Sequence, residues 1–421
     1  MKNERIESIS TLEKIRDDVR ASSPENGKAG EDEAILLCAG GGCIASGAYA
    51  FKEALQNALN AHGLADQVTI IETGCLGPCA QGPVCVMGRD KTYYQGLQPA
   101  DAEELVTSHL KGNQIVERLT WQGEGEKPVP VLSDIEFFKR QTKVVLRNCG
   151  RIVPTSLEDY IAHDGYAALA KALTSMTPEQ VIDEVRISGL RGRGGAGFPT
   201  HTKWTFTRNS ADPQKYILCN ADEGDPGAYM DRSVLEGDPH SIIEGMALGA
   251  YAIGSSKGYV YVRAEYPLAI ERLQIAIDAA RDAGLLGERI FGTDFSFDVE
   301  IRMGSGAFVC GEETALINSI EGKRGEPRPR PPFPAVKGLW QKPSCLNNVE
   351  TFANIPAIIH RGGAWYAGMG TEKSKGTKVF ALAGAINVSG LVEVPIGAKL
   401  REIIYDIGGG IKDGGTFKAA Q

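Results

Sequence analysis

The sequence predicts an α/β protein built from successive domains, and three observations lead to that prediction. Short β-branched or apolar runs alternate with segments whose apolar residues recur every three or four positions, which is typical of strands alternating with helices. Residues 121–130 are rich in glycine, proline and charge and lack an apolar period, which predicts a linker. The 421 residues, 42% hydrophobic and 23% charged, are enough for about two to four domains with buried cores.

The elements before this linker predict a small α/β unit. Residues 5–20 are patterned as a charged amphipathic helix, and the turn-rich residues 21–27 end it. The order that follows is strand, helix, strand, strand, helix, which is typical of a thioredoxin-type unit. The predicted strands are residues 34–38, 68–73 and 83–87, the first helix carries Phe51, Leu55, Ala58 and Leu59, and the closing helix covers residues 100–110.

A larger α/β domain is predicted from about residue 140. Prolines force residues 326–334 into an extended conformation. The glycine-rich C-terminal segment follows a predicted hairpin and short helix and has no closing element, which indicates a domain cut short. The predicted elements are strands at residues 216–219, 259–263 and 297–302, a helix carrying Ile270, Leu273, Ile277 and Ala280, hairpin strands at 378–382 and 390–394, and a helix at 400–405.

Composition and charge exclude several classes of protein. The net charge of −8 and the isoelectric point near 5.5 argue against nucleic acid as a partner. The charged N-terminus lacks the apolar segment of a signal peptide, and no run of about 18 apolar residues occurs, so we expect a cytoplasmic chain without a membrane span. In that compartment nine cysteines indicate metal or redox chemistry instead of disulfides.

Four cysteines form two close pairs, Cys38 with Cys43 and Cys75 with Cys79. Each pair follows a predicted strand and lies among glycines, so four thiolates can converge on one metal centre. Each pair can chelate one iron of a [2Fe–2S] cluster while glycine N–H groups donate to the sulfurs. A tetrahedral zinc site suits the same spacing. The other cysteines are expected as core residues, namely Cys85, Cys149, Cys219, Cys310 and Cys345.

Residues 189–199 contain five glycines, two arginines and a phenylalanine, a composition suited to an anionic cofactor. Glycines let the backbone adopt positive φ and bring N–H groups against phosphate or a flat ring. Arg191 and Arg193 add forked, charged hydrogen bonds. Gly192, Gly194 and Gly197 also match the dinucleotide fingerprint, which is weak evidence without a preceding strand. A flexible glycine loop is the alternative.

Five segments carry a resemblance to a known family. They are the glycine loop with residues 198–206, and residues 219–227, 310–315, 331–334 and 347–351. Together they resemble the NADH-binding flavoprotein subunit of respiratory complex I (the 51 kDa type). They resemble more closely its relatives in soluble NAD(P)-linked, often electron-bifurcating hydrogenases and in NAD-dependent formate dehydrogenases. The fused unit with four cysteines resembles the thioredoxin-like [2Fe–2S] ferredoxin of the soluble relatives.

The resemblance implies a fold and a domain organisation. The fold is α/β, with a thioredoxin-like [2Fe–2S] domain, a Rossmann-like FMN- and NAD(H)-binding domain and the start of a ubiquitin-like β-grasp domain. We expect an N-terminal helix and linker at residues 1–30, the [2Fe–2S] ferredoxin domain at 31–120, a linker at 121–145, the FMN- and NAD(H)-binding domain at 146–370, and a partial, apparently truncated β-grasp domain at 371–421.

The resemblance also implies roles for individual residues. No catalytic acid or base is expected, because hydride transfer between nicotinamide and flavin depends on positioning and tuning, with Glu312 the nearest candidate. Phe198, Phe206 and Phe333 would clamp the adenine of NAD(H), and Arg330 would lie near its ribose or phosphates. The residues expected at FMN are Gly192, Arg193, Gly194, Gly195, Lys203, Asn220, Asp222, Glu223, Gly224, Gly311, Glu312, Glu313, Asn347 and Asn348. The cluster ligands would be Cys38, Cys43, Cys75 and Cys79.

Residue type alone leaves other interpretations open. Asp222 and Glu223 also suit a solvated acidic turn, and Glu312 and Glu313 suit the first turn of a helix. The three phenylalanines also suit a core, although the prolines around Phe333 favour its exposure.

The function that the resemblance implies is that of an NAD(P)H oxidoreductase (diaphorase) subunit. It would exchange hydride between NAD(H) and FMN and pass single electrons to iron–sulfur subunits of a soluble complex, with a bifurcating hydrogenase favoured. NADP(H) remains possible, because Arg328 and Arg330 could bind a 2′-phosphate. Relatives also hold a [4Fe–4S] cluster in a C-terminal region that has no counterpart in this sequence. The alternatives are a formate dehydrogenase subunit and a non-enzymatic iron–sulfur relay or scaffold.

Overall fold

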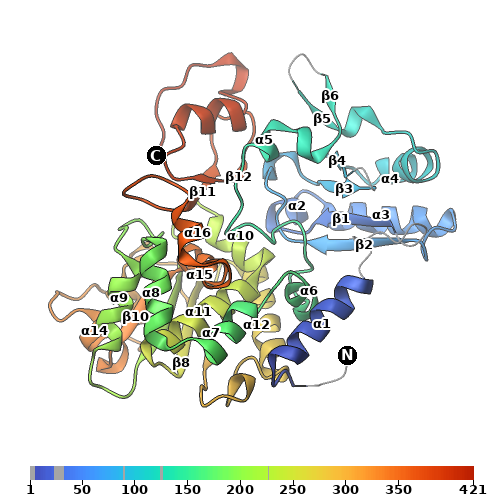
Figure 1. The fold of residues 1–421 in the computed structure, drawn as a ribbon. Helices are drawn as coiled ribbons and strands as arrows, with labels where there is room; N and C mark the ends of the chain where they lie inside the picture. Colours follow the sequence, from blue (N-terminus) through green and yellow to red (C-terminus); the bar gives the residue numbers. More distant parts are fainter. Residues whose placement is uncertain (1–4, 23–32, 89–90, 124–126, 226) are drawn as a thin grey trace.

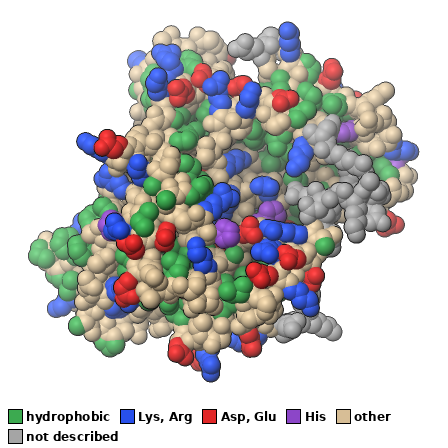
Figure 2. Space-filling view, viewed as in Figure 1, with side chains coloured by type: hydrophobic (Ala, Val, Ile, Leu, Met, Phe, Trp, Pro, Cys, Tyr) green, Lys and Arg blue, Asp and Glu red, His purple; other side chains and the backbone are tan. Residues whose placement is uncertain are grey.

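Two α/β units lie side by side in the computed structural model, which describes residues 5–22, 33–88, 91–123, 127–225 and 227–421 (Figure 1). The smaller unit, blue to cyan, follows an N-terminal helix, and the larger unit runs from green to orange. No helix within the described ranges is long and apolar enough to cross a membrane. Lys and Arg side chains and Asp and Glu side chains are interspersed over the face shown in Figure 2.

The N-terminal helix begins later than the sequence pattern predicts. Helix α1 covers Ile9–Ser22, because the Ser8 hydroxyl accepts the Thr11 N–H at 3.2 Å and so starts the helix there. It packs on α6 (Leu157–Ala162) of the larger unit, and the buried residues Ile6 and Leu12 belong to that unit's core. Ala21 and Ser22, which were predicted as part of a turn, are the last helical residues, and the rest of that predicted turn, residues 23–27, lies outside the described residues.

The smaller unit is a four-stranded sheet with helices beside it. The strand order is β2-β1-β3-β4, with β1 and β2 parallel and the other neighbours antiparallel. The four predicted apolar residues of the first helix are buried against this sheet. Strand β4, which the sequence analysis missed, adds one edge. The bounds are β1 Glu33–Cys38, α2 Gly41–Ala45, α3 Ala48–Ala61, β2 Val68–Thr73, η2 Cys79–Gln81, β3 Cys85–Met87, β4 Thr92–Tyr94, α4 Asp101–Glu104, the π-helix η3 Leu105–Lys111 and η4 Glu117–Leu119.

The segment predicted as a linker is structured where it is described. Strands β5 (Trp121–Gln122) and β6 (Pro128–Val129) pair antiparallel, and Val131 bridges to Thr92 of the smaller unit. Residues 124–126, between the two strands, lie outside the described residues. The turn η6 (Leu132–Asp134) and helix α5 (Glu136–Lys139) follow, and Phe137 is buried.

The larger unit has a parallel sheet of order β10-β7-β8-β9, the Rossmann-like arrangement that the sequence predicts. Its strands are buried on both faces: Ile217 and Val260 join the core under α11, whereas Leu218 and Tyr259 join a second core under α13. The bounds are α6 Leu157–Ala162, α7 Ala167–Ser175, α8 Pro178–Ser188, α9 Thr200–Arg208, β7 Tyr216–Ala221, α10 Met230–Gly237, α11 Pro239–Ile253, β8 Lys257–Arg263, α12 Pro267–Asp282, η7 Ile290–Gly292, β9 Asp298–Gly304, η8 Phe308–Gly311, α13 Glu313–Ile320, α14 Pro334–Lys337, η9 Leu339–Gln341, β10 Ser344–Asn348, α15 Val349–Arg361 and α16 Gly363–Ala367.

The predicted C-terminal hairpin forms between β11 (Thr377–Leu382) and β12 (Gly390–Pro395). The predicted short helix is mostly a π-helix, η10 (Glu402–Ile407), and a turn η11 (Lys412–Gly414) follows. The hairpin shares its core with the smaller unit, because Val392 packs in one cluster with Leu76 and Phe137.

Candidate functional site

The glycine loop lies between two helices, α8 and α9, and not between a strand and a helix as the dinucleotide fingerprint requires. Arg191 bridges to Pro199, and the Gly192 N–H donates to the Phe198 carbonyl at 2.8 Å, so the loop is a closed hairpin-like turn. Gly194 and Gly195 at its tip are exposed, and Gly195 has a φ of 108°. The tip therefore presents backbone to solvent with no side chain to cover it.

The structure gives the Arg193 side chain a different role from the cofactor contact predicted for it. Its guanidinium is buried and donates to the carbonyls of Thr377, Lys375 and Arg191 and to the Tyr366 hydroxyl, at 2.6–3.0 Å. These bonds tie the loop to the start of β11. Arg193 thus holds the glycine loop in place.

Asp222 lies just past the end of β7 and is the site's most unusual group. It is 7% exposed, and neither of its carboxylate oxygens has a hydrogen-bond partner among the described residues. Burial raises its pKa to about 6, against the lowering effect of Arg263. Beside it, Asn220 donates to the Gly311 carbonyl at 2.8 Å, which brings the loop before α13 against the end of the sheet.

Glu223 acts as a cap of helix α10. Its two carboxylate oxygens accept the N–H groups of Met230, Asp231 and Arg232 at 2.8–3.1 Å. Burial is the largest effect on its pKa, which is raised. Next to it, a Cβ at Gly224 would lie 2.6 Å from the Phe308 ring, so a side chain there would have to displace that ring.

An ion-pair network joins four of the predicted residues across separate elements. Lys203 of α9 lies 3.6 Å from Glu313, and Arg330 donates to the other oxygen of Glu313 at 2.6 Å. Glu312 caps α13 by accepting the N–H groups of Thr314 and Ala315, and its second oxygen lies 3.8 Å from Arg330. The network brings α9, α13 and the proline-rich segment together.

The three phenylalanines predicted to clamp an adenine lie on the surface and not in the core. Phe198, Phe206 and Phe333 are 44%, 57% and 58% exposed. Phe206 lies on α9 and Phe333 caps α14, and these two helices pack against each other. Exposed aromatic rings on adjacent helices form an apolar surface that a flat ring can stack on.

Asn347 and Asn348, at the end of β10, hold the framework together. Asn347 is buried and accepts from the Trp204 indole at 2.9 Å. Asn348 caps α15 through the Glu350 N–H and donates to Asp231 at 2.7 Å. Asp231, a buried residue of α10, was not predicted from the sequence. Burial and the charge of Glu223 raise the pKa of Asp231 well above its usual range. No motif marks Asp231, because it follows the acidic turn by several residues.

The four predicted cluster ligands meet at one cavity of the smaller unit. Cys38 ends β1, Cys43 lies in α2, and Cys75 and Cys79 flank the turn after β2, with 3.4 Å between the last two sulfurs. Hydrogen bonds from Cys43 and Cys75 lower the pKa of the Cys38 thiol. The other five cysteines are buried, as predicted for core residues.

Helix α10 connects this cavity to the candidate site at the sheet edge. Its first residues are capped by Glu223, and Arg232, Ser233 and Glu236 farther along it line the cysteine cavity. At about 1.5 Å per residue, its eight residues span roughly 12 Å. Helix α10 therefore contacts both candidate sites.

Comparisons with known families divide the chain in the same way as the fold. Residues 185–357 match the family described as the Nuo51 FMN-binding domain. Residues 26–109 match the family described as the thioredoxin-like [2Fe–2S] ferredoxin. The first match contains the glycine loop, the sheet and the ion-pair network, and the second contains all four cysteines of the cavity.

Individual relatives are similar over most of the chain. The chain is 64% identical to the NADP-reducing hydrogenase subunit HndC of Solidesulfovibrio fructosivorans over 67% of its own length and 57% of that protein's. It is 49% identical to an NADH-quinone oxidoreductase subunit of Rhizobium meliloti, over 66% of each. A structure of an NAD⁺-reducing [NiFe]-hydrogenase superimposes with a TM-score of 0.56 at 28% identity, over 94% of this chain and 66% of that one. The chain thus spans less than two thirds of these curated relatives.

Proposed function

We propose that this chain is an NAD(P)H oxidoreductase subunit. Its residues 185–357 belong to the Nuo51 FMN-binding family, and its residues 26–109 belong to the thioredoxin-like [2Fe–2S] ferredoxin family. It would exchange electrons between a nicotinamide nucleotide and iron–sulfur centres of a larger complex. The observation that carries the proposal is that helix α10 contacts both candidate sites, because Glu223 caps its start while Arg232 and Glu236 line the four-cysteine cavity.

The residues at the sheet edge fit a flavin. Asp222 offers a buried carboxylate with both oxygens unpaired among the described residues, which suits the N–H donors of an isoalloxazine ring. Gly194 and Gly195 leave exposed backbone for the ring and phosphate, and Lys203 supplies a cation. When bound, FMN takes a hydride from a nicotinamide and returns single electrons, which links a two-electron donor to one-electron centres.

Other predicted site residues would support the flavin by positioning its surroundings. Glu223 holds the start of α10, Glu312 holds the start of α13, and Asn348 holds the start of α15. Arg193 fixes the loop to β11. Because these side chains already have partners, we assign them to the framework of the site.

The nucleotide would bind over the exposed phenylalanines. Phe206 and Phe333 offer ring faces on adjacent helices, and two cations, Lys203 of α9 and Arg330, both pair with Glu313. Arg330 is balanced by Glu312 and Glu313, so its charge is already partly compensated before any phosphate binds.

A hydrogenase complex is the assembly we favour, because the relative at 64% identity is named as a hydrogenase subunit and the superimposed structure is that of a hydrogenase. The iron–sulfur partners would be other subunits of that complex. Identification of the subunits that co-purify with this chain tests the assignment, and a formate-oxidising partner would contradict it.

The proposed redox function is tested by visible spectroscopy of the full chain purified without oxygen and reconstituted with FMN. We expect a flavin band and iron–sulfur absorbance that both bleach when NADH or NADPH is added. A chain that binds no flavin after reconstitution, or whose cysteines hold zinc, would overturn the proposal.

A further inference from the structure

We propose that Glu236, a residue of the larger unit, lowers the reduction potential of the [2Fe–2S] cluster held by the smaller unit. This inference rests on the proposed function, because it takes the four cysteines as the cluster's ligands. It assigns the cluster a partner outside its own domain, so that the second unit completes the cluster's surroundings.

Glu236 forms part of the wall of the cysteine cavity. It is 3% exposed, and its Oε2 accepts the Gly41 N–H at 2.8 Å. Gly41 begins α2, the short helix that carries Cys43. A Cβ at Gly41 would lie 3.0 Å from Arg232 and 3.2 Å from Glu236, so a side chain there would crowd the carboxylate.

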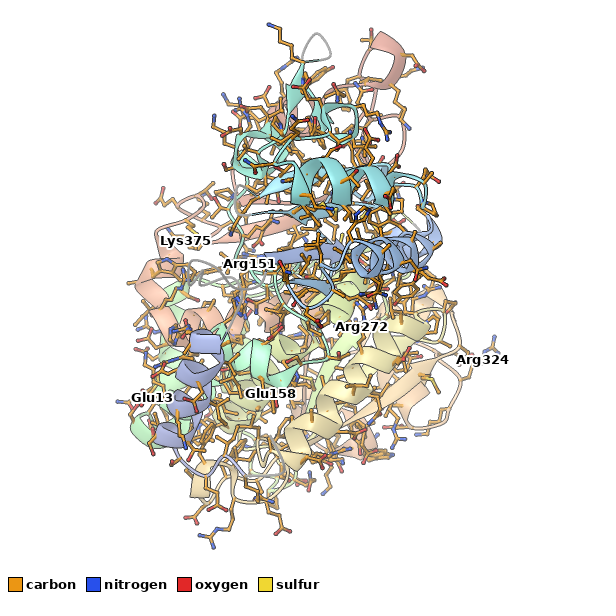
Figure 3. All side chains as sticks on the ribbon, turned by 90° about the vertical axis from the view of Figure 1, so that its right-hand side faces the viewer. Glu13, Arg151, Glu158, Arg272, Arg324 and Lys375 are labelled. Carbon is orange, nitrogen blue, oxygen red and sulfur yellow. The ribbon has the colours of Figure 1, made fainter. Side chains whose placement is uncertain are left out.

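One arginine pairs with this carboxylate, and a second holds the backbone of Glu236. Arg232 lies 3.3 Å from its Oε1. Arg272 of α12 donates to the Glu236 carbonyl at 2.7 Å and to the Ala39 carbonyl at 2.9 Å, so it bonds to both units at once. In Figure 3, Arg272 lies between α12 and the smaller unit.

Electrostatics predicts the direction of the effect. Reduction adds negative charge to the cluster, and a buried carboxylate nearby makes that addition less favourable. Glu236 also occupies the Gly41 N–H, a type of donor that would otherwise stabilise charge on sulfur. Without the carboxylate, Arg232 on the same cavity wall would lose its balancing charge and favour the reduced cluster.

The test is a redox titration of the cluster in the full chain, followed by electron paramagnetic resonance. For Glu236→Gln we expect the ratio of reduced to oxidised cluster at a given potential to rise about tenfold, which for one electron is a shift of about 59 mV. Glu271→Gln is the matched control: it removes the same charge from the exposed side of α12, next to Arg272, and should leave the potential unchanged.

Hydrogen–deuterium exchange of residues 38–46 in both variants reports whether the units stay docked. An unchanged potential in Glu236→Gln overturns the inference. So does a loss of protection in that segment, because the effect would then come from undocking and not from charge. A wild-type chain with no cluster signal at all would instead contradict the proposed function.

Discussion

At the scale of single residues, Asp222 combines a buried carboxylate with the absence of any hydrogen-bond partner among the described residues. Such a group costs free energy in the folded protein unless a ligand supplies the missing donors. That cost is measurable without flavin, because it changes as the carboxyl gains a proton.

The first prediction is that Asp222→Asn stabilises the flavin-free chain at neutral pH. Burial raises the pKa of Asp222 from 3.8 to about 6, so the ionised form destabilises the fold above that pH, by up to about 3 kcal/mol. As pH falls from 6 to 4 the folded wild type takes up the proton and the penalty disappears. Thermal unfolding should show a gain of up to about 3 kcal/mol at pH 7.5 and of only about 1 kcal/mol at pH 4.5. An equal gain at both pH values would contradict the raised pKa of Asp222.

The second prediction concerns Phe333. Replacement by alanine should weaken NADH binding by about 1–3 kcal/mol, because a stacked ring face is lost, and should leave the FMN content unchanged. Phe380→Ala is the control, since Phe380 is also a surface phenylalanine, 38% exposed, but lies on the C-terminal hairpin. Isothermal titration with NADH distinguishes the two variants, and equal affinity in both would remove the stacking assignment.

At the scale of elements, several joints depend on buried carboxylates that cap backbone N–H groups. Glu393 of β12 is fully buried and accepts the N–H groups of residues 144–146 at 2.9–3.0 Å. It thereby attaches the C-terminal hairpin to the segment that enters the larger unit. Three amides converging on one carboxylate make this attachment strong.

The third prediction is that Glu393→Ala destabilises the fold by about 3–5 kcal/mol, since three buried N–H groups lose their acceptor. Urea unfolding of the chain measures the loss. Glu372→Ala removes an exposed carboxylate from the turn before the same hairpin and should change the stability by less than about 0.5 kcal/mol. A similar small effect at Glu393 would mean that water can replace the carboxylate.

Elements with a strong local pattern were predicted well from sequence. Strand β2 has its predicted bounds, because a β-branched run bounded by turn residues specifies a strand without help from the rest of the chain. The antiparallel pair of strands β5 and β6 was not predicted. These two short strands are stabilised by pairing with each other and by contact with the smaller unit, and a local sequence pattern does not show such contacts.

The same distinction between local patterns and long-range contacts applies to the candidate site. Sequence motifs located Asp222, Lys203 and Glu313, which the structure brings to one edge of the sheet. They did not reveal that Arg193 is bound by β11, or that Glu236 reaches Gly41, because both contacts join residues far apart in the chain. Long-range partners of a charged residue cannot be read from its neighbours in sequence.

At the scale of the whole molecule, the smaller unit is held against the larger one at separate places. Arg272 bonds to Ala39 near the first cysteine pair. The hairpin holds the second pair, because the Leu391 N–H donates to the Gly77 carbonyl at 3.0 Å and the Ala80 N–H to the Ser389 carbonyl at 3.2 Å. Helix α1, which precedes the smaller unit, packs on the larger one. These contacts favour a fixed distance between the two candidate redox sites.

The two units approach each other closely at two glycines, Gly74 and Gly237. A Cβ at Gly74 would lie 2.4 Å from the Gly237 Cα, a contact that backbone cannot relieve without moving one unit. Gly237 is the last residue of α10, and Gly74 precedes Cys75, one of the four proposed cluster ligands. The absence of side chains at both positions therefore sets how near α10 comes to the cluster.

The fourth prediction follows from that contact. Gly74→Ala should separate the units, raise deuterium uptake in residues 38–46, and slow cluster reduction after mixing with NADH at least tenfold, while flavin reduction keeps its rate. Electron transfer weakens steeply with distance, whereas hydride transfer to flavin involves only the larger unit. Gly368→Ala adds the same methyl group within the larger unit, 3.2 Å from the Trp365 carbonyl, and should leave both rates unchanged. If Gly74→Ala reduces its cluster as fast as the wild type, electrons do not reach the cluster through the contact between Gly74 and α10.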